Sequence, residues 1–237
     1  PNVITFSAAV SACEKGGCWQ RALALLVTMA ARRISPDVMS YNAAISACAN
    51  GGRWQFALDL LCSMTSLKVN IDAMSCSSVI SACGRGRRWE LALVVLQNMA
   101  DLSVTPDLVS YNAAINACRK GRQWQLALGV LSTMVELRCT PNVISWSAVI
   151  SACEEAGRWQ LALAVLEAMS QARVLPSVVS CSAAVSACEK GDQWQLALAL
   201  VDVMPDLRAN PNVISRSAAL GACAKGGPWQ LASLLLE

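Results

Sequence analysis

Short hydrogen-bonding side chains recur along this sequence at intervals of 35 residues. Asn42 and Asn112 stand at equivalent places, and serine fills that place in the other intervals. A second recurrent set, which includes Asp37 and Asp72, lies near the start of each interval. Asparagine, serine and aspartate carry donors or acceptors on short stems, so they can contact a polar ligand with little loss of rotamer entropy. The same residue types also cap helix N-termini, and that alternative stays open for both sets.

The sequence lacks several residue types and motifs on which common catalytic sites depend. It contains no histidine, so neither a Ser-His-Asp triad nor a histidine-containing deaminase motif can be built from it. It contains no C-x-x-C pair, no phosphate-binding P-loop and no G-x-S-x-G motif. We therefore expect a chain that is not an enzyme and that binds neither a metal nor a cofactor.

The recurrent residues belong to a unit that fills the whole chain without an insertion or a deletion. A constant period of this length is typical of a solenoid, in which each unit buries its apolar face against its neighbours. We expect a single array over residues 1–237, with the seventh unit cut short. Its units are 1–35, 36–70, 71–105, 106–140, 141–175, 176–210 and 211–237.

Each unit is predicted to form two helices. In the second unit the first helix is expected from Val38 to Ala49, with Gly51 and Gly52 ending it. The second helix is expected to start at residue 53 or 54 and to reach Ser66, before the proline of the next unit. The fold class is therefore all-α, an α-solenoid of seven helix-turn-helix repeats.

The helices show recurrent faces at helical spacing. In the second unit, a buried stripe is expected to include Tyr41, Ile45 and Cys48, whereas Met39 and Asn42 fall on a separate stripe. That separate stripe runs from an aliphatic residue through small polar residues to a polar or basic tip. Tryptophan and methionine recur in the second helices and are expected to form the core between helices.

Composition limits the membrane and redox alternatives. Hydrophobic residues make up 55% of the chain and the mean hydropathy is +0.43, but no uninterrupted apolar run approaches the ~20 residues that span a bilayer. Of the twelve cysteines, seven hold one repeat position, so we expect buried thiols in a reducing, intracellular setting and no disulfides. The start at proline and the end within a helix suggest an excised fragment, so any targeting segment is expected to lie outside this sequence.

The period, the proline-led junctions and openings such as PDVMSYNAAISAC and PDLVSYNAAINAC resemble the pentatricopeptide repeat family over the whole chain. The resemblance implies a right-handed superhelix that binds single-stranded RNA, one base per repeat, read by two or three side chains. It also implies a role in organellar RNA processing, stabilisation or editing, in a mitochondrion or chloroplast.

Carried onto this sequence, the resemblance assigns three sets of residues. The base-reading pairs, each a residue of one first helix and a junction residue of the next unit, are Ser7 with Asp37, Asn42 with Asp72, Ser77 with Asp107, Asn112 with Asn142, Ser147 with Ser177, and Ser182 with Asn212. The aliphatic residues that would sandwich the bases are Ile4, Met39, Met74, Val109, Ile144, Val179 and Ile214. The basic tips that would contact phosphates are Lys15, Arg85, Lys120, Lys190 and Lys225.

The pairing habit of the family further implies a base order. Asn with Asp prefers U, Asn with Asn prefers a pyrimidine, Ser with Asp leans to G, and Ser with Asn leans to A. With the N-terminal end at the RNA 5′ end, the pairs would read G-U-G-C/U, one undefined base, then A.

Two alternatives accompany these assignments. The basic tips could be solvated helix ends whose charge suits a helix C-terminus. The array could also be a helical scaffold that binds protein segments in the same groove, although the polar stripe lacks the aromatic or large apolar anchors that a peptide groove should offer. The net charge of +3 is too small to decide between RNA and protein.

Overall fold

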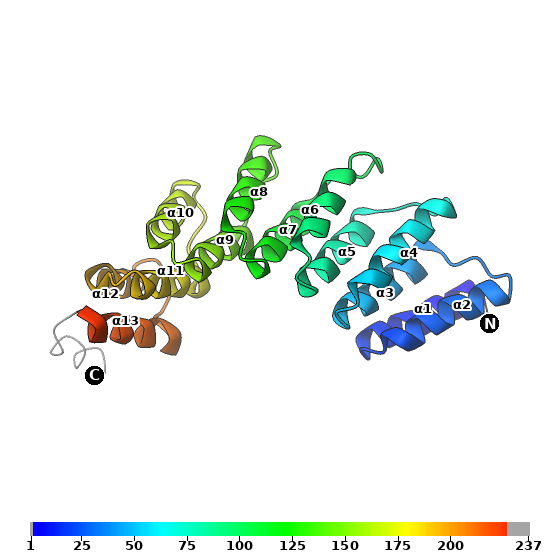
Figure 1. Ribbon diagram of the computed structural model, residues 1–237, viewed down its shortest axis with the longest axis horizontal. Coiled ribbons are helices and arrows are strands. Elements are labelled where there is room, and N and C mark those ends of the chain that lie inside the picture. The colour runs from blue at the N-terminus through cyan, green and yellow to red at the C-terminus, as the bar shows by residue number, and fades with distance from the viewer. Residues whose placement is uncertain (1, 227–237) are drawn as a thin grey trace. The chain divides into compact units, whose positions relative to one another are not determined.

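A computed structural model of the chain describes residues 2–226. These residues form thirteen α-helices and no strand, numbered in chain order in Figure 1. The helices are α1 (Val3–Lys15), α2 (Trp19–Ala31), α3 (Val38–Asn50), α4 (Trp54–Ser66), α5 (Ala73–Arg85), α6 (Trp89–Asn98), α7 (Leu108–Lys120), α8 (Trp124–Glu136), α9 (Val143–Glu155), α10 (Trp159–Gln171), α11 (Val178–Lys190), α12 (Trp194–Val203) and α13 (Val213–Gly226).

The helix bounds confirm the predicted helix-turn-helix repeat. The first helix of the second repeat begins at Val38 as expected and ends one residue later than expected, at Asn50. The second helix, Trp54–Ser66, has the predicted bounds. The predicted second helix of the seventh repeat lies outside the described residues.

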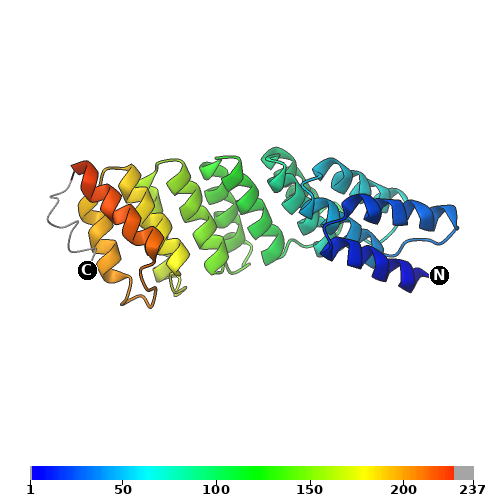
Figure 2. The same ribbon diagram turned by 90° about the horizontal axis from the view of Figure 1, so that it is seen from below.

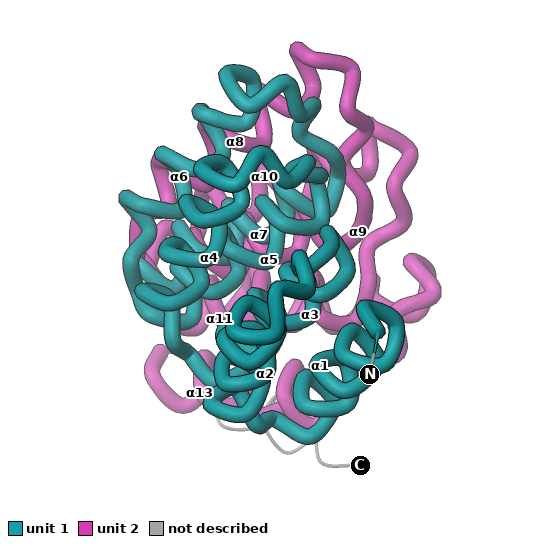
Figure 3. The backbone as a smooth tube through the Cα atoms, turned by 90° about the vertical axis from the view of Figure 1, so that its right-hand side faces the viewer, with its two compact units in different colours: residues 1–121 teal, residues 122–237 magenta. Residues whose placement is uncertain are grey.

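The chain divides into two compact units, residues 1–121 and 122–237, coloured separately in Figure 3. From here on, 'unit' means one of these two parts, and each 35-residue period is called a repeat. The first unit contains α1 to α7 and the second contains α8 to α13. Each is a solenoid of helical repeats. One continuous array over residues 1–237, and its right-handed course, stay predictions.

Within each unit the helices form two layers (Figures 1 and 2). First helices stack directly on one another: α1 on α3, α3 on α5 and α5 on α7 in the first unit, and α9, α11 and α13 in the second. A second helix packs on the first helix of its own repeat and on that of the next, as α4 does on α3 and α5. Among the described residues of either unit, no two second helices pack against each other in this way.

The core lies between the two layers and repeats with the sequence. Ile45 and Cys48 of α3, and Ile80 and Cys83 of α5, are fully buried, as their stripe predicted. The recurrent methionines, which lie in the second helices or immediately after them, are also fully buried: Met29, Met64, Met99, Met134, Met169 and Met204. Because each stripe is buried partly by the next repeat, stacking rather than any single repeat completes the core.

The recurrent tryptophans differ from the methionines, because they are only half-buried and lie at the contact between repeats. Trp19 lies so close to Gly51 of the next repeat that a Cβ there would be 2.6 Å from its Cδ1. The guanidinium carbon of Arg53, also from the next repeat, lies 5.0 Å from the centroid of the Trp19 ring. This is a cation–π distance. The same glycine and arginine contacts recur on Trp54, with Gly86 and Arg88.

The cysteines are all free thiols. Of the seven at the repeat position, six are buried and Cys13 is half-buried. Burial raises the pKa of Cys48, Cys83, Cys118 and Cys188 to about 11. These thiols are therefore protonated at neutral pH and act as small apolar core groups.

Gly86→Ala tests the contact between repeats. A Cβ at Gly86 would lie 2.2 Å from Trp54 Cδ1, and the backbone φ of −77° carries no strain for alanine. We expect a loss of about 1–3 kcal/mol in the free energy of unfolding, because the ring must move. The lower end is expected, since Ala156 holds the equivalent place in the fifth repeat.

The matched control is Gly129→Ala in α8, where an added Cβ would meet nothing within 4 Å. This change should be neutral or should stabilise by up to about 1 kcal/mol, as alanine favours a helix over glycine. Urea unfolding measures both variants. Equal stability of Gly86→Ala and Gly129→Ala would contradict the close packing.

Candidate nucleic-acid interface

The structure brings four of the predicted base-reading pairs into hydrogen-bonding contact. Asn42 Nδ2 donates to both carboxylate oxygens of Asp72, at 3.2 and 3.1 Å. Ser7 Oγ donates to Asp37 Oδ1 at 3.2 Å. The two remaining contacts are Ser147 Oγ with Ser177 Oγ at 3.4 Å, and Ser182 Oγ with Asn212 Oδ1 at 3.3 Å. Each contact joins one repeat to the next.

One further pair, Ser77 with Asp107, is not joined in this way. Ser77 Oγ donates to the Met74 carbonyl, at 3.1 Å, rather than to Asp107. Asn112 and Asn142 belong to different compact units, so their pairing stays a prediction.

The junction residues are also helix caps. Asp37, Asp72, Asp107, Asn142 and Ser177 each accept a hydrogen bond from the backbone N–H three residues later, at the start of a first helix. Asn212 does the same for Ser215, at 2.9 Å. The capping alternative is therefore confirmed, and it is compatible with ligand contact because a carboxylate has a second oxygen.

Asp72 shows how the two roles can coexist. Its Oδ1 accepts from the Ser75 N–H at 2.7 Å and lies 2.8 Å from Ser75 Oγ, whose single proton is within reach of both this oxygen and Asn42 Oδ1. Its Oδ2 accepts only from Asn42 and so retains lone-pair capacity. Partial burial raises the pKa of Asp72, but the hydrogen bonds from Ser75 and Asn42 outweigh that effect and hold the pKa below its ordinary value of 3.8. The side chain is thus ionised at neutral pH and can only accept hydrogen bonds.

Within the base-reading pairs, the residues of the first helices are more buried than the junction residues. Asn42 is 5% exposed, and its Oδ1 accepts a hydrogen bond from Ser75 Oγ at 2.5 Å. Ser77, Ser147 and Ser182 are likewise buried. Asn42 therefore has its acceptor and its donors satisfied within the protein, and a ligand must exchange one of these hydrogen bonds for its own.

A serine in the first turn of each first helix from α3 onward completes the arrangement, and Thr5 holds the same place in α1. The sequence did not predict a role for it. Ser75 Oγ bridges Asn42 of one repeat and Asp72 of the next. Ser40 Oγ similarly contacts Ser7 Oγ at 2.8 Å and Asp37 Oδ1 at 2.6 Å. Both serines are fully buried. The capping-box spacing of three residues was the signal that could have identified them.

The aliphatic residues predicted to sandwich bases are strongly exposed. Ile4 is 75% exposed and Val109, the least exposed of the seven, is 59% exposed. The others lie between these values: Met39, Met74, Ile144, Val179 and Ile214. Large aliphatic side chains gain nothing from water contact, so their repeated exposure beside polar pairs favours a ligand surface.

The basic tips have unequal surroundings. Arg85 Nη1 donates to Asn50 Oδ1 at 2.9 Å and to the Ala49 carbonyl at 3.1 Å. Burial and the charges of Arg85 and Arg119 lower the pKa of Lys120. Lys15 is exposed. In the second unit, Lys190 and Lys225 instead form ion pairs with glutamates.

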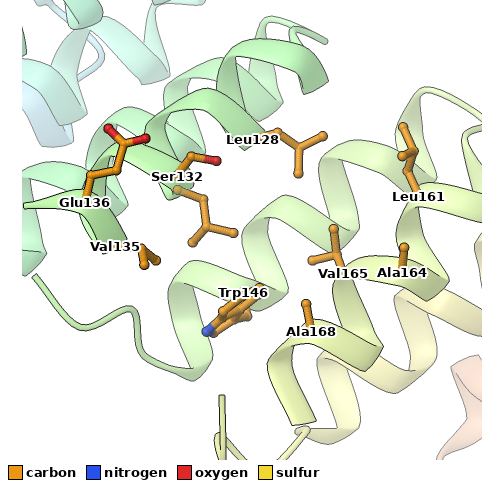
Figure 4. A pocket seen from close by; sticks show the side chains of 10 residues that line it. Leu128, Ser132, Val135, Glu136, Trp146, Leu161, Ala164, Val165 and Ala168 are labelled. Atoms are coloured by element: carbon orange, nitrogen blue, oxygen red, sulfur yellow. The ribbon is translucent and has the colours of Figure 1, made fainter. Parts of the chain in front are cut away.

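Apolar grooves occur in the layer of second helices, where those helices are not packed on one another. One groove of about 510 Å³ lies between α8 and α10 (Figure 4). Leu128 and Val135 of α8, Val165 of α10 and the Trp146 ring of α9 line it. The Trp146 Nε1 atom is buried and has no hydrogen-bond partner within the described residues.

The described part of the chain contains neither a cluster of metal-ligating side chains nor a membrane-spanning helix. No group of three or more His, Cys, Asp or Glu side chains within residues 2–226 could hold a metal ion. None of the helices defined there is long and apolar enough to cross a bilayer.

Comparison with known proteins identifies the class of this fold. The profile described as "Pentatricopeptide repeat domain" matches residues 1–51, 59–121 and 94–156, and the profile described as "PPR repeat" matches 39–69 and 144–174. The chain therefore belongs to the pentatricopeptide repeat family. A search of curated proteins found no match.

Solved structures share the fold at low sequence identity. The pentatricopeptide repeat protein PPR10 from maize is 22% identical with a TM-score of 0.76, over 100% of this chain and 34% of that one. PPR10 in complex with an 18-nt psaJ RNA element is 17% identical with a TM-score of 0.64, over 99% and 39%. The PPR domain of Arabidopsis thaliana PRORP1 in complex with tRNA is 13% identical with a TM-score of 0.63, over 73% and 91%. This chain thus spans about a third of the PPR10 chain.

Ser75→Ala tests the buried bridge between repeats. Removing the hydroxyl leaves Asn42 Oδ1 buried without the donor that it has now, and an unsatisfied buried acceptor costs about 1–3 kcal/mol. We expect a loss of that size in urea unfolding. Ser66→Ala is the control, because Ser66 is exposed and bonds only the Ser63 carbonyl. A loss no greater than that of Ser66→Ala would contradict the role of the bridge.

Proposed function

We propose that this chain binds single-stranded RNA sequence-selectively, one base per repeat, and that it performs no catalytic step itself. The observation that carries the proposal is the recurrent junction at which a polar pair lies in contact beside an exposed aliphatic residue. Asn42, Asp72 and Met39 are the clearest example. Two similar structures, PPR10 in complex with RNA and the PRORP1 domain in complex with tRNA, support the same ligand class.

Selectivity would come from an exchange of hydrogen bonds. In the free protein, Asn42 and Asp72 satisfy each other. A base whose edge matches the pair replaces those hydrogen bonds with new ones, whereas a mismatched base leaves a polar group unpaired. The aliphatic residues would hold the base plane by apolar contact that every base can make.

Affinity would come largely from the basic tips. Lysine and arginine neutralise phosphates and release counterions, which makes binding depend on salt but not on sequence. Lys15, Arg85 and Lys120 of the first unit are the proposed contacts. Lys190 and Lys225 hold the same repeat position in the second unit, where each is already ion-paired with a glutamate.

A protein-binding scaffold is the second candidate. The groove between α8 and α10 supports it, because an apolar pocket with a buried indole N–H could hold an apolar anchor of a protein segment. The groove lies among the second helices, whereas the polar pairs belong to first helices and junctions. RNA binding is favoured because hydrogen-bonded polar pairs recur at four junctions and an exposed aliphatic residue recurs in all seven repeats.

A location in a mitochondrion or chloroplast, and a part there in RNA processing, stabilisation or editing, belong to the proposal through family resemblance. The fold does not select a compartment, since nuclear proteinaceous RNase P 2 from A. thaliana shares it, at 12% identity and a TM-score of 0.59. Imaging of the full-length protein in its own cells tests the location.

Selection from a random pool of short RNAs tests the proposal. We expect binding at low salt that weakens as salt rises, and enrichment of the order G-U-G-C/U, any base, then A. A pool of single-stranded DNA of the same length is the control for charge alone. If no RNA binds at low salt, the scaffold becomes the better hypothesis.

Asp72→Asn tests base reading at one pair. Asp72 accepts only, so it suits the N3–H of uracil, whereas asparagine adds a donor that suits the N3 acceptor of cytosine. We expect preference at that base to move from U toward C, with a good base contact discriminating by roughly 1–3 kcal/mol. Competition between two RNAs that differ only at this base measures the change.

Thermal stability separates reading from capping in this experiment. Asparagine and aspartate are comparable N-caps, so Asp72→Asn should unfold at nearly the wild-type temperature. Asp59→Asn on the exposed surface of α4 removes the same charge away from the junction and should leave base preference unchanged. Equal weakening for U and C targets would restrict Asp72 to capping.

A further inference from the structure

Three of the five basic tips, Arg85, Lys190 and Lys225, reach back to the preceding repeat, and the residue met there differs between the two units. Lys190 Nζ lies 3.3 Å from the Glu154 carbonyl oxygen, and Lys225 Nζ lies 3.2 Å from the Glu189 carbonyl oxygen. Arg85 Nη1 makes the same contact with the Ala49 carbonyl. In all three cases the partner stands 36 residues earlier in the chain.

In the second unit this partner brings a carboxylate. Glu154 Oε1 lies 2.6 Å from Lys190 Nζ, and Glu189 Oε1 lies 3.6 Å from Lys225 Nζ. The lysine side chains are 45% and 47% exposed, and the glutamates are 19% and 29% exposed. Both lysines are thus within reach of a ligand, but each already has a counter-charge.

In the first unit the corresponding residues bring no charge. The residue 36 positions before Arg85 is Ala49, and the one 36 positions before Lys120 is Gly84. Neither Arg85 nor Lys120 forms an ion pair with an acidic side chain in the described part of the chain. The nearest charges that act on Lys120 are those of Arg85 and Arg119, which are positive. A phosphate beside Lys120 would relieve this repulsion.

The glutamates do not stabilise the helices that carry them. Glu154 and Glu189 lie in the last turns of α9 and α11, where a negative charge opposes the helix dipole. Exposed ion pairs contribute little to stability, so fold stability alone does not account for them.

We propose that Glu154 and Glu189 act as intramolecular substitutes for an RNA phosphate, so that phosphate binding depends on the first unit while Lys190 and Lys225 contribute little. The inference rests on the proposed RNA binding. A lysine and its paired carboxylate together carry no net charge, so the pair cannot neutralise a phosphate. Binding at that lysine then releases no counterion from the RNA. The two glutamates would therefore set the affinity without taking part in base reading.

The salt dependence of binding measures how many tips take part. With Lys15, Arg85 and Lys120 alone, the slope of log affinity against log salt should be about −2, whereas all five tips would give about −3.5. Lys120→Ala should flatten the slope by about 0.7, and Lys190→Ala should leave it unchanged.

Removing a carboxylate should release its lysine. We expect Glu154→Gln to strengthen binding of the selected RNA about fivefold at low salt and to steepen the slope by about 0.7. The double variant Glu154→Gln/Lys190→Ala should return to wild-type affinity, because the gain depends on Lys190. Glu189→Gln, alone and combined with Lys225→Ala, is an independent second test of the same kind.

Glu167→Gln is the matched control, because Glu167 is an exposed glutamate of α10 in the same unit, bonded to Gln171 at 3.3 Å. It makes the same change in net charge and should alter affinity by less than twofold. Base preference should be the same in all these variants, and thermal unfolding confirms that each is folded.

Two results would overturn the inference while leaving RNA binding in place. Lys190→Ala could weaken wild-type binding as much as Lys120→Ala does, or Glu154→Gln could behave like Glu167→Gln. If neither the wild-type chain nor Glu154→Gln binds any RNA at low salt, the proposed function fails and the inference fails with it.

Discussion

The hydrogen-bonded junction between successive repeats is the interaction on which the rest of the structure depends. At the second junction, Asp72 caps α5 and simultaneously accepts from Asn42 of α3, with Ser75 buried between them. One carboxylate therefore starts a helix and fixes its position against the preceding helix. Because the cap must meet a side chain 30 residues earlier, an insertion within the repeat would break the contact. The constant 35-residue period is consistent with this requirement.

The opposite ends of the first helices are fixed by packing rather than by hydrogen bonds. Gly86, at the end of α5, allows the backbone to approach Trp54, and Arg88 covers the same ring. The tryptophan is half-buried because its surface is shared between the next repeat and solvent. Helix α5 is thus held at its start by a polar contact and at its end by an aromatic one. This arrangement positions the polar pairs on a rigid element, as selective recognition requires.

Periodicity was sufficient to predict the elements. Helical spacing predicted α3 to within one residue and α4 without error, because apolar spacing and glycine or proline stops are local signals. The pairs of Asn42 with Asp72 and Ser182 with Asn212 came instead from the family resemblance. The role of Ser75 was missed, since a small serine in a first turn looks like an ordinary capping residue until the neighbouring repeat is placed.

The contacts of the tryptophans and of the basic tips could not be predicted for a related reason. A repeat position shows which residues are equivalent, but not which residue of the next repeat they meet. Trp19 was assigned to the core with Met29, yet only the stacking of repeats shows that it faces Gly51. Lys120 and Lys190 are likewise equivalent in sequence, and only the offset of 36 residues shows that one faces glycine and the other glutamate.

Because of that offset, base reading and the net charge of the basic tips depend on different residues of the repeat. Base reading depends on the helix starts, where the polar pairs and aliphatic residues lie. Charge depends on the helix ends, where the tip of one repeat meets the last turn of the repeat before. A substitution such as glutamate at position 154 can therefore change the net charge around the basic tips. It does so without altering a helix cap, a base-reading pair or the packing of a tryptophan. If the chain binds RNA, its affinity and its sequence preference can change independently, repeat by repeat.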